Sequence, residues 1–167
     1  FKKDEIRYQS NTNDYLNYKY VKSKGDDVLQ KMLDIAETEE NVFKKNMINC
    51  GGAQTIMKNV DWVFWQKVYI LSEKLFTQLT DLNNQKVKEN PKYHTLQIWC
   101  ADMWALLFTA WKLGHETKTD KILDFTWATC HTNKWHKNLI YHNAGVTRQD
   151  KKLFMKQNFT NKLPYFV

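Results

Sequence analysis

Three stretches of the chain repeat apolar residues with the spacing of an α-helix. Residues 26–37 open with two aspartates that can cap a helix, and apolar side chains then recur at helical spacing. Residues 60–82 carry one apolar stripe, and Asp61 near their start suits the positive end of a helix dipole. Residues 96–113 are apolar around most of the helix circumference, so we expect this helix to be buried and to end at Gly114. The stripe residues are Val28, Leu29, Met32, Leu33 and Ala36 in the first helix and Phe64, Val68, Leu71, Leu75 and Leu79 in the second.

The remaining segments show no sustained helical period. Residues 1–25 are polar, aromatic and Asn-rich, which favours extended or loop structure, and the charged residues 81–92 predict a connection that Pro91 closes. Beyond Gly114, short apolar runs predict strands at 117–119, 122–125, 138–141 and 153–155. We therefore expect a helix-rich α/β fold with two long helices and a few short strands, in a single domain or domain fragment.

Composition limits the class of protein. A chain of 167 residues that is 43% hydrophobic and 14% aromatic can bury an ordinary core, and five Gly and two Pro exclude collagen-like and linker-like architectures. No stretch approaches the roughly 20 apolar residues of a membrane-spanning helix and none resembles a secretory signal, so we expect no membrane span and a cytoplasmic location. Cys50, Cys100 and Cys130 are widely spaced and odd in number, which favours reduced thiols.

Asp102 is the one formal charge between Lys92 and Lys112, close to the start of the apolar helix. Burying a carboxylate there costs several kcal/mol unless it is paired, hydrogen-bonded or protonated. A general base, or a carboxylate that binds an acceptor at the wall of a cleft, fits this position. The alternative is an aspartate that caps its own helix or pairs with a lysine.

A cluster of Cys130, His131, His136 and His142 raises the question of a metal site. The spacings do not suit a structural zinc site, since there is no C-x2-C pair and His131 and His136 would lie on different faces of a helix. A single histidine that serves as one ligand of a hard divalent ion, shared with a phosphate-bearing substrate, is less demanding. His142 is the best placed candidate for that role.

The chain has a basic excess, with 25 Lys and Arg against 18 Asp and Glu and a net charge of +7. Basic residues interleaved with Tyr and Trp can bind a nucleic-acid backbone and stack on bases. Here the basic runs never exceed two residues and only Arg7 and Arg148 are arginine. A solvated surface accounts better for most of the lysines, so nucleic acid is not the favoured partner.

Several short segments, taken in chain order, resemble the C-terminal half of nucleotide-diphospho-sugar transferases with the type-A glycosyltransferase fold. The similarity covers about residues 10–166 and consists of ordered short matches. They are Gly51–Lys58, Asp61–Trp65, Gln97–Leu106, Leu123–Thr129, Ile140–Val146, Leu153–Lys156 and Leu163–Tyr165.

The resemblance implies a reaction and a set of site residues. Such enzymes move a sugar from a nucleotide-sugar donor to an acceptor hydroxyl, with Mn²⁺ or Mg²⁺ on the donor diphosphate. A base takes the proton of the acceptor hydroxyl, while a lysine stabilises the departing diphosphate. Carried onto this sequence, the acid or base is Asp102, the metal ligand is His142, and the substrate-binding residues are Gly51, Gly52, Gln54, Trp99 and Lys156.

The chain also departs from that family. It has no Asp-x-Asp motif, because Asp26 and Asp27 are adjacent, and it lacks the βαβ run of a nucleotide-binding half. Its first residue is Phe1 rather than Met, so we expect a piece of a longer protein whose upstream half binds the donor. Two alternatives stay open: a basic, aromatic-rich module that binds nucleic acid or an acidic protein surface, and a structural or assembly subunit.

Overall fold

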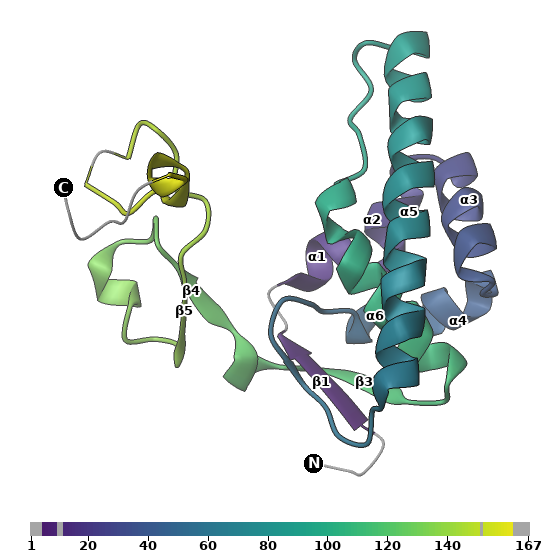
Figure 1. Cartoon of the computed structure of the whole chain (residues 1–167), viewed down its shortest axis with the longest axis horizontal. Coiled ribbons are helices and arrows are strands. Elements are labelled where there is room, and N and C mark those ends of the chain that lie inside the picture. The colour runs from purple at the N-terminus through teal and green to yellow at the C-terminus, as the bar shows by residue number, and fades with distance from the viewer. Residues whose placement is uncertain (1–4, 10–11, 151, 162–167) are drawn as a thin grey trace. The chain divides into compact units, whose positions relative to one another are not determined.

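The structure, a computed structural model, describes residues 5–9, 12–150 and 152–161 (Figure 1). The chain forms two compact units, Phe1–Lys121 and Ile122–Val167. The described residues include no helix long and apolar enough to cross a membrane. The helix-rich α/β class that the sequence predicts is confirmed at this coarse level, since the longer helices and two small sheets make up the regular structure.

The first unit contains the long helices and a small sheet. Its strands are β1 (Glu5–Gln9), β2 (Thr55–Ile56) and β3 (Glu116–Asp120), and its α-helices are α1 (Asn13–Leu16), α2 (Tyr18–Lys22), α3 (Asp26–Ala36), α4 (Glu40–Lys45), α5 (Trp62–Glu89) and α6 (Ala101–Lys112). Short 3-10 helices lie at Met47–Asn49 and Ile98–Cys100. The sheet has the order β2-β1-β3, with β1 antiparallel to β2 and parallel to β3.

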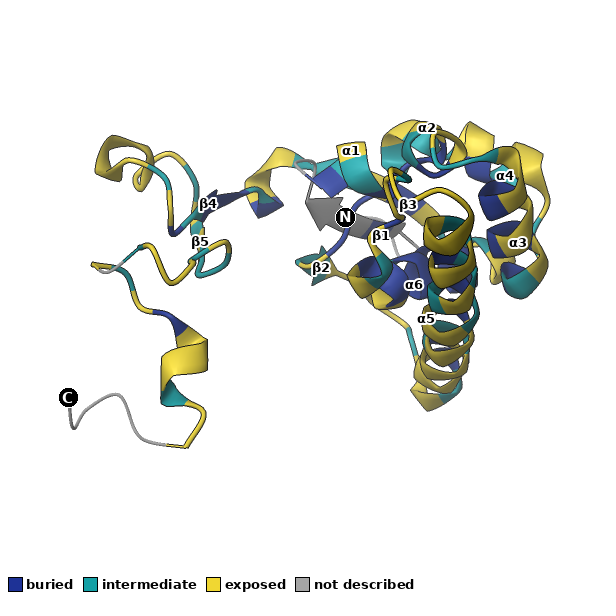
Figure 2. Ribbon diagram, turned by 90° about the horizontal axis from the view of Figure 1, so that it is seen from above, coloured by how far each residue is buried: buried dark blue, intermediate teal, exposed yellow. Residues whose placement is uncertain are grey.

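Helix α6 forms the centre of the core, as its apolar circumference predicts. Figure 2 shows it almost wholly buried beside α5, whose outer face is exposed. Trp104 is fully buried, and its indole Nε1 donates a hydrogen bond of 2.9 Å to the carbonyl oxygen of Leu16. Phe43 packs edge to face against Phe108, so α4 closes the same core.

Helix α5 is longer than its apolar stripe predicts. It starts as expected, because the side chain of Asp61 accepts a hydrogen bond of 2.9 Å from the backbone N–H of Phe64. The predicted connection at 81–92 is wrong, since the helix continues to Glu89. Polar contacts occur along the extension. The side-chain amide of buried Asn83 donates to the carbonyl of Leu96 at 2.9 Å and accepts from the N–H of Leu96 at 3.1 Å, and Nζ of Lys86 lies 2.6 Å from Oδ2 of Asp27.

Residues 1–25 also differ from the prediction, because they include β1, α1 and α2 as well as loops. The side chain of Asn17 caps α2 by accepting a hydrogen bond of 3.0 Å from the N–H of Tyr20. Helix α3 lies where predicted and follows Gly25, whose φ of 131° suits glycine. The two aspartates at its start occupy the first turn instead of the cap position.

The second unit has little regular structure. Strands β4 (Phe125–Trp127) and β5 (Ile140–His142) pair in parallel, with Phe125 opposite Ile140 and Trp127 opposite His142. The strand predicted at 122–125 is wrong for its first half, because Lys121–Leu123 form a 3-10 helix, whereas Phe125 begins β4. The strand predicted at 153–155 is wrong, since these residues form an irregular segment before a 3-10 helix at Lys156–Phe159.

Candidate functional site

The first unit contains a hollow of about 420 Å³ where the glycine-containing loop meets α5 and α6. Gly52 and Ala53 of the loop form one wall, Trp65 of α5 forms a second, and Asp102 and Met103 of α6 form a third. We call it the glycine-loop groove. It brings together two of the residues that the sequence singles out, Gly52 and Asp102, which lie 50 positions apart in the sequence.

Gly52 is required by close packing in this groove. A Cβ atom added there would lie 2.6 Å from Sδ and 2.9 Å from Cγ of Met103, and 3.1 Å from a methyl carbon of Leu16. The backbone N–H of Gly52 donates a hydrogen bond of 2.9 Å to the hydroxyl of Thr12, which anchors the loop. Any larger residue at this position would therefore displace the side chain of Met103 or move the loop away from α6.

Asp102 is exposed, although the helix that carries it is otherwise largely buried. It sits in the first turn of α6, where a negative charge is favoured by the helix dipole. One carboxylate oxygen, Oδ1, accepts a hydrogen bond of 2.9 Å from the N–H of Met103. Among the described residues, no hydrogen bond to the other oxygen is found, so that oxygen is open to a ligand hydroxyl.

A second hollow, of about 380 Å³, also has Asp102 in its lining. We call it the tryptophan groove, because Trp99 forms its rim together with Tyr69 and Phe76 of α5. The ring of Trp99 lies 5.5 Å from that of Tyr15, which supports it from behind. Burial raises the pKa of Tyr15 to about 12, so its hydroxyl stays protonated at neutral pH. Asp102 is thus shared by two grooves with aromatic walls.

Two residues of the predicted acceptor loop do not line either groove. Gly51 is buried, and Gln54 is only partly exposed. Oε1 of Gln54 is buried without a hydrogen-bond partner among the described residues. The structure therefore places Gly52, Asp102 and Trp99 at the grooves, and Gly51 and Gln54 outside their linings.

His142 and Lys156 lie in the second unit, where an aromatic cluster surrounds the histidine. The imidazole centroid is 4.6 Å from the ring of Phe125 and 5.4 Å from that of Trp127. Burial, and then the charge of Lys156, lowers the pKa of His142 below its usual range. The structure thus brings His142 and Lys156 close enough to interact electrostatically.

The described neighbours of His142 do not by themselves complete a divalent-cation centre. Mg²⁺ and Mn²⁺ favour oxygen ligands, whereas the immediate neighbours of His142 are aromatic rings and the charge of a lysine. No group of three or more His, Cys, Asp or Glu that could hold a metal occurs within the described residues. The binding of Mn²⁺ or Mg²⁺ by His142 stays a prediction.

The three cysteines are all free, as the sequence predicts. Cys100 is buried beside the site, and burial raises its pKa to about 12, with a smaller contribution from Asp102. A thiol with so high a pKa is a poor nucleophile at neutral pH. Cysteine chemistry therefore has no part in the candidate site.

The aromatic residues of α5 that face the grooves were missed at the level of the sequence. Trp65, Tyr69 and Phe76 follow a second helical stripe, offset by one position from the buried stripe of Phe64, Val68 and Leu75. They are 47%, 63% and 54% exposed. Apolar residues at helical spacing outside the core stripe were the available signal.

The comparisons with protein-family models, with curated proteins and with solved structures gave no match to this chain.

Proposed function

We propose that the two grooves lined by Asp102 hold a saccharide acceptor, and that Asp102 is the base for its hydroxyl during sugar transfer from a nucleotide-sugar donor. One observation carries the proposal. Gly52 of the loop lies in one hollow with Asp102 of α6, and Asp102 also lines a second hollow with Trp99, three positions before it. The donor and the reaction class come from the resemblance in sequence.

The chemistry of the groove walls favours a saccharide. A sugar ring presents a C–H face that packs on an aromatic ring and hydroxyl groups that need hydrogen-bond acceptors. Trp65 and Trp99 are 47% and 58% exposed; Trp65 lines one groove, Trp99 lines the other, and Asp102 lines both. An acceptor that occupies both grooves therefore has an aromatic ring in each of them and the carboxylate of Asp102 as a shared hydrogen-bond acceptor.

Asp102 has the geometry of a positioned base. The N–H of Met103 holds one of its oxygens, which leaves the other oxygen free to accept a proton from a bound hydroxyl. A hydroxyl that loses its proton as it attacks is a stronger nucleophile, and removal of such a base slows reactions by roughly 10²- to 10⁴-fold. The first unit thus supplies the acceptor side of the reaction.

Lys156 is proposed to meet the donor diphosphate, and His142 is proposed as a ligand of its cation. Both assignments rest on the resemblance in sequence alone. The described neighbours of His142 do not complete a cation site, so the catalytic step of the proposal is assigned to Asp102.

The test is sugar transfer by the product of the full gene. We expect labelled sugar to move from one of a panel of nucleotide sugars to a mixed saccharide acceptor, and Asp102→Asn to slow this transfer by roughly 10²-fold or more. Asp81→Asn is the matched control, because Asp81 is an exposed aspartate of α5 outside both grooves. Absence of transfer by the unaltered protein, or equal rates for the two variants, would contradict the proposal.

A further inference from the structure

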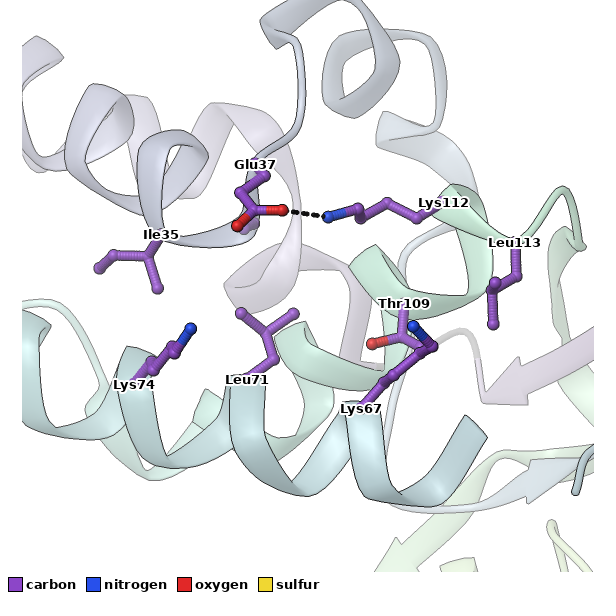
Figure 3. A pocket seen from close by; sticks show the side chains of 9 residues that line it. Ile35, Glu37, Lys67, Leu71, Lys74, Thr109, Lys112 and Leu113 are labelled. Carbon is purple, nitrogen blue, oxygen red and sulfur yellow. Dashed lines mark hydrogen bonds and ion pairs between the residues drawn. The ribbon is translucent and has the colours of Figure 1, made fainter. Parts of the chain in front are cut away.

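A third hollow, of about 230 Å³, lies in the first unit between α3, α5 and α6 (Figure 3). Lys67 and Lys74 rise into it from α5, one turn to either side of Leu71, and Lys112 reaches into it from the end of α6. We call it the lysine pocket. It shares no lining residue with the glycine-loop groove or the tryptophan groove.

The pocket has more positive than negative charge. Glu37, at the end of α3, is its one acidic residue and accepts a hydrogen bond from Lys112, with 2.8 Å between Oε2 and Nζ. This bond, and to a smaller degree the charge of Lys74, holds the pKa of Glu37 below its usual range. Within the described part of the chain, Lys67 and Lys74 have no ion-pair partner, so two ammonium groups stay unbalanced.

Part of the pocket lining is apolar. We call partly buried Ile35 and Leu71, with Leu113, which is 48% exposed, the apolar floor, and Thr109 adds a single neutral polar side chain. Thr109 itself is 4% exposed, which places it at the bottom of the pocket. A ligand that fills this space therefore needs an apolar body as well as an anionic group.

From this arrangement we infer that the lysine pocket binds a phosphate monoester with an apolar organic group. A phosphate monoester carries a charge of about −1.5 to −2 at pH 7, which matches the two unbalanced ammonium groups. A monocarboxylate would leave one of them unbalanced, and inorganic phosphate would leave the apolar floor uncovered. Lysine binds phosphate as a point charge with several donors, so flexible side chains on two turns of α5 suffice.

The probe is phenyl phosphate, titrated into the whole chain by calorimetry, with amide resonances followed by NMR. We expect binding that shifts the resonances of Thr109 and Leu113, and each of Lys67→Gln and Lys74→Gln to weaken it by roughly 5-fold, because exposed charges are partly screened. Lys88→Gln is the matched control, since Lys88 lies on the same helix, outside the pocket. Glu37→Gln releases Lys112 from its partner and is expected to tighten binding by roughly 3-fold.

Four results would overturn the inference. The first is the absence of binding at tens of millimolar phenyl phosphate, and the second is a loss of affinity in Lys88→Gln as large as in Lys67→Gln or Lys74→Gln. The third and fourth are binding of benzoate, or of inorganic phosphate, as tight as that of phenyl phosphate. None of them bears on the function proposed for Asp102, because the probe and the variants touch neither of the two grooves.

Discussion

Replacing Gly52 by alanine tests the packing of the glycine loop on α6. The added Cβ would lie 2.6 Å from the sulfur of Met103, far inside van der Waals contact, and 3.1 Å from Leu16. The side chain of Met103 is flexible and can turn into the groove, whereas the loop backbone is anchored to Thr12. Because overpacked cores lose about 1 to 3 kcal/mol, we expect Gly52→Ala to lower the free energy of unfolding by about 1.5 kcal/mol.

The measurement is urea unfolding followed by far-UV circular dichroism at 222 nm. All the described α-helices belong to the first unit, so this signal reports on that unit. With an m-value of about 2 kcal/mol per molar, the midpoint should fall by about 0.7 M.

Met103→Ala provides the control, because it removes the atoms that the new Cβ would meet. In the Met103→Ala background we expect Gly52→Ala to lower the free energy of unfolding by at least about 1 kcal/mol less than it does in the unaltered chain, since the two residues are in contact. An unchanged midpoint for Gly52→Ala, or strictly additive effects in the double variant, would refute the close approach of loop and helix.

Three further predictions concern other parts of the chain. Asn83→Leu leaves the buried N–H and carbonyl of Leu96 without partners and should lower the free energy of unfolding, measured in urea, by about 2 to 4 kcal/mol. A decrease below about 0.5 kcal/mol would contradict the two hydrogen bonds between Asn83 and Leu96. The pKa of His142 measured by NMR should lie below its ordinary 6.5, and Lys156→Met should raise it part of the way, because burial remains. Since folding lowers this pKa, the second unit should be most stable above pH 6.5 and lose stability as the pH falls through the folded value; a pKa at or above 6.5 would contradict this. Equimolar Mn²⁺ added to the chain alone should not selectively broaden the resonances of His142, and such broadening would show that residues near it complete a metal site.

The predictions from the sequence succeeded where one face of a helix is apolar. The stripes of α3 and α5 and the apolar circumference of α6 identified these helices, because burial in one core imposes the helical period on the sequence. The last turns of α5 were missed, since the contacts of Asn83 and Lys86 there are polar and do not form an apolar stripe: Asn83 is hydrogen-bonded to Leu96, and Lys86 forms an ion pair with Asp27. The parallel pairing of β1 with β3 joins segments about 110 residues apart, and no local pattern specifies such a partner.

The candidate site was predictable in part, where single residues stand out in the local sequence. Gly52 and Asp102 stand out locally, as a glycine pair and as a lone charge in an apolar helix, and the structure brings them to one groove. The exposure of Asp102 was not predictable, because it depends on how α6 is rotated against α5. The lysine pocket was not predicted, because its lysines come from two helices and no local sequence pattern distinguishes them from the other lysines.

The proposed function requires that a saccharide binds in the two grooves that Asp102 lines. The most direct measurement is saturation-transfer NMR with a panel of neutral oligosaccharides on the unaltered chain, Trp99→Ala and Trp62→Ala. Trp62 is a matched control, because it is 72% exposed at the start of α5 but lines neither groove. We expect a saturation-transfer signal for at least one oligosaccharide, which Trp99→Ala abolishes and Trp62→Ala leaves unchanged. The absence of this signal for every oligosaccharide, or its survival in Trp99→Ala, would refute saccharide binding at Asp102.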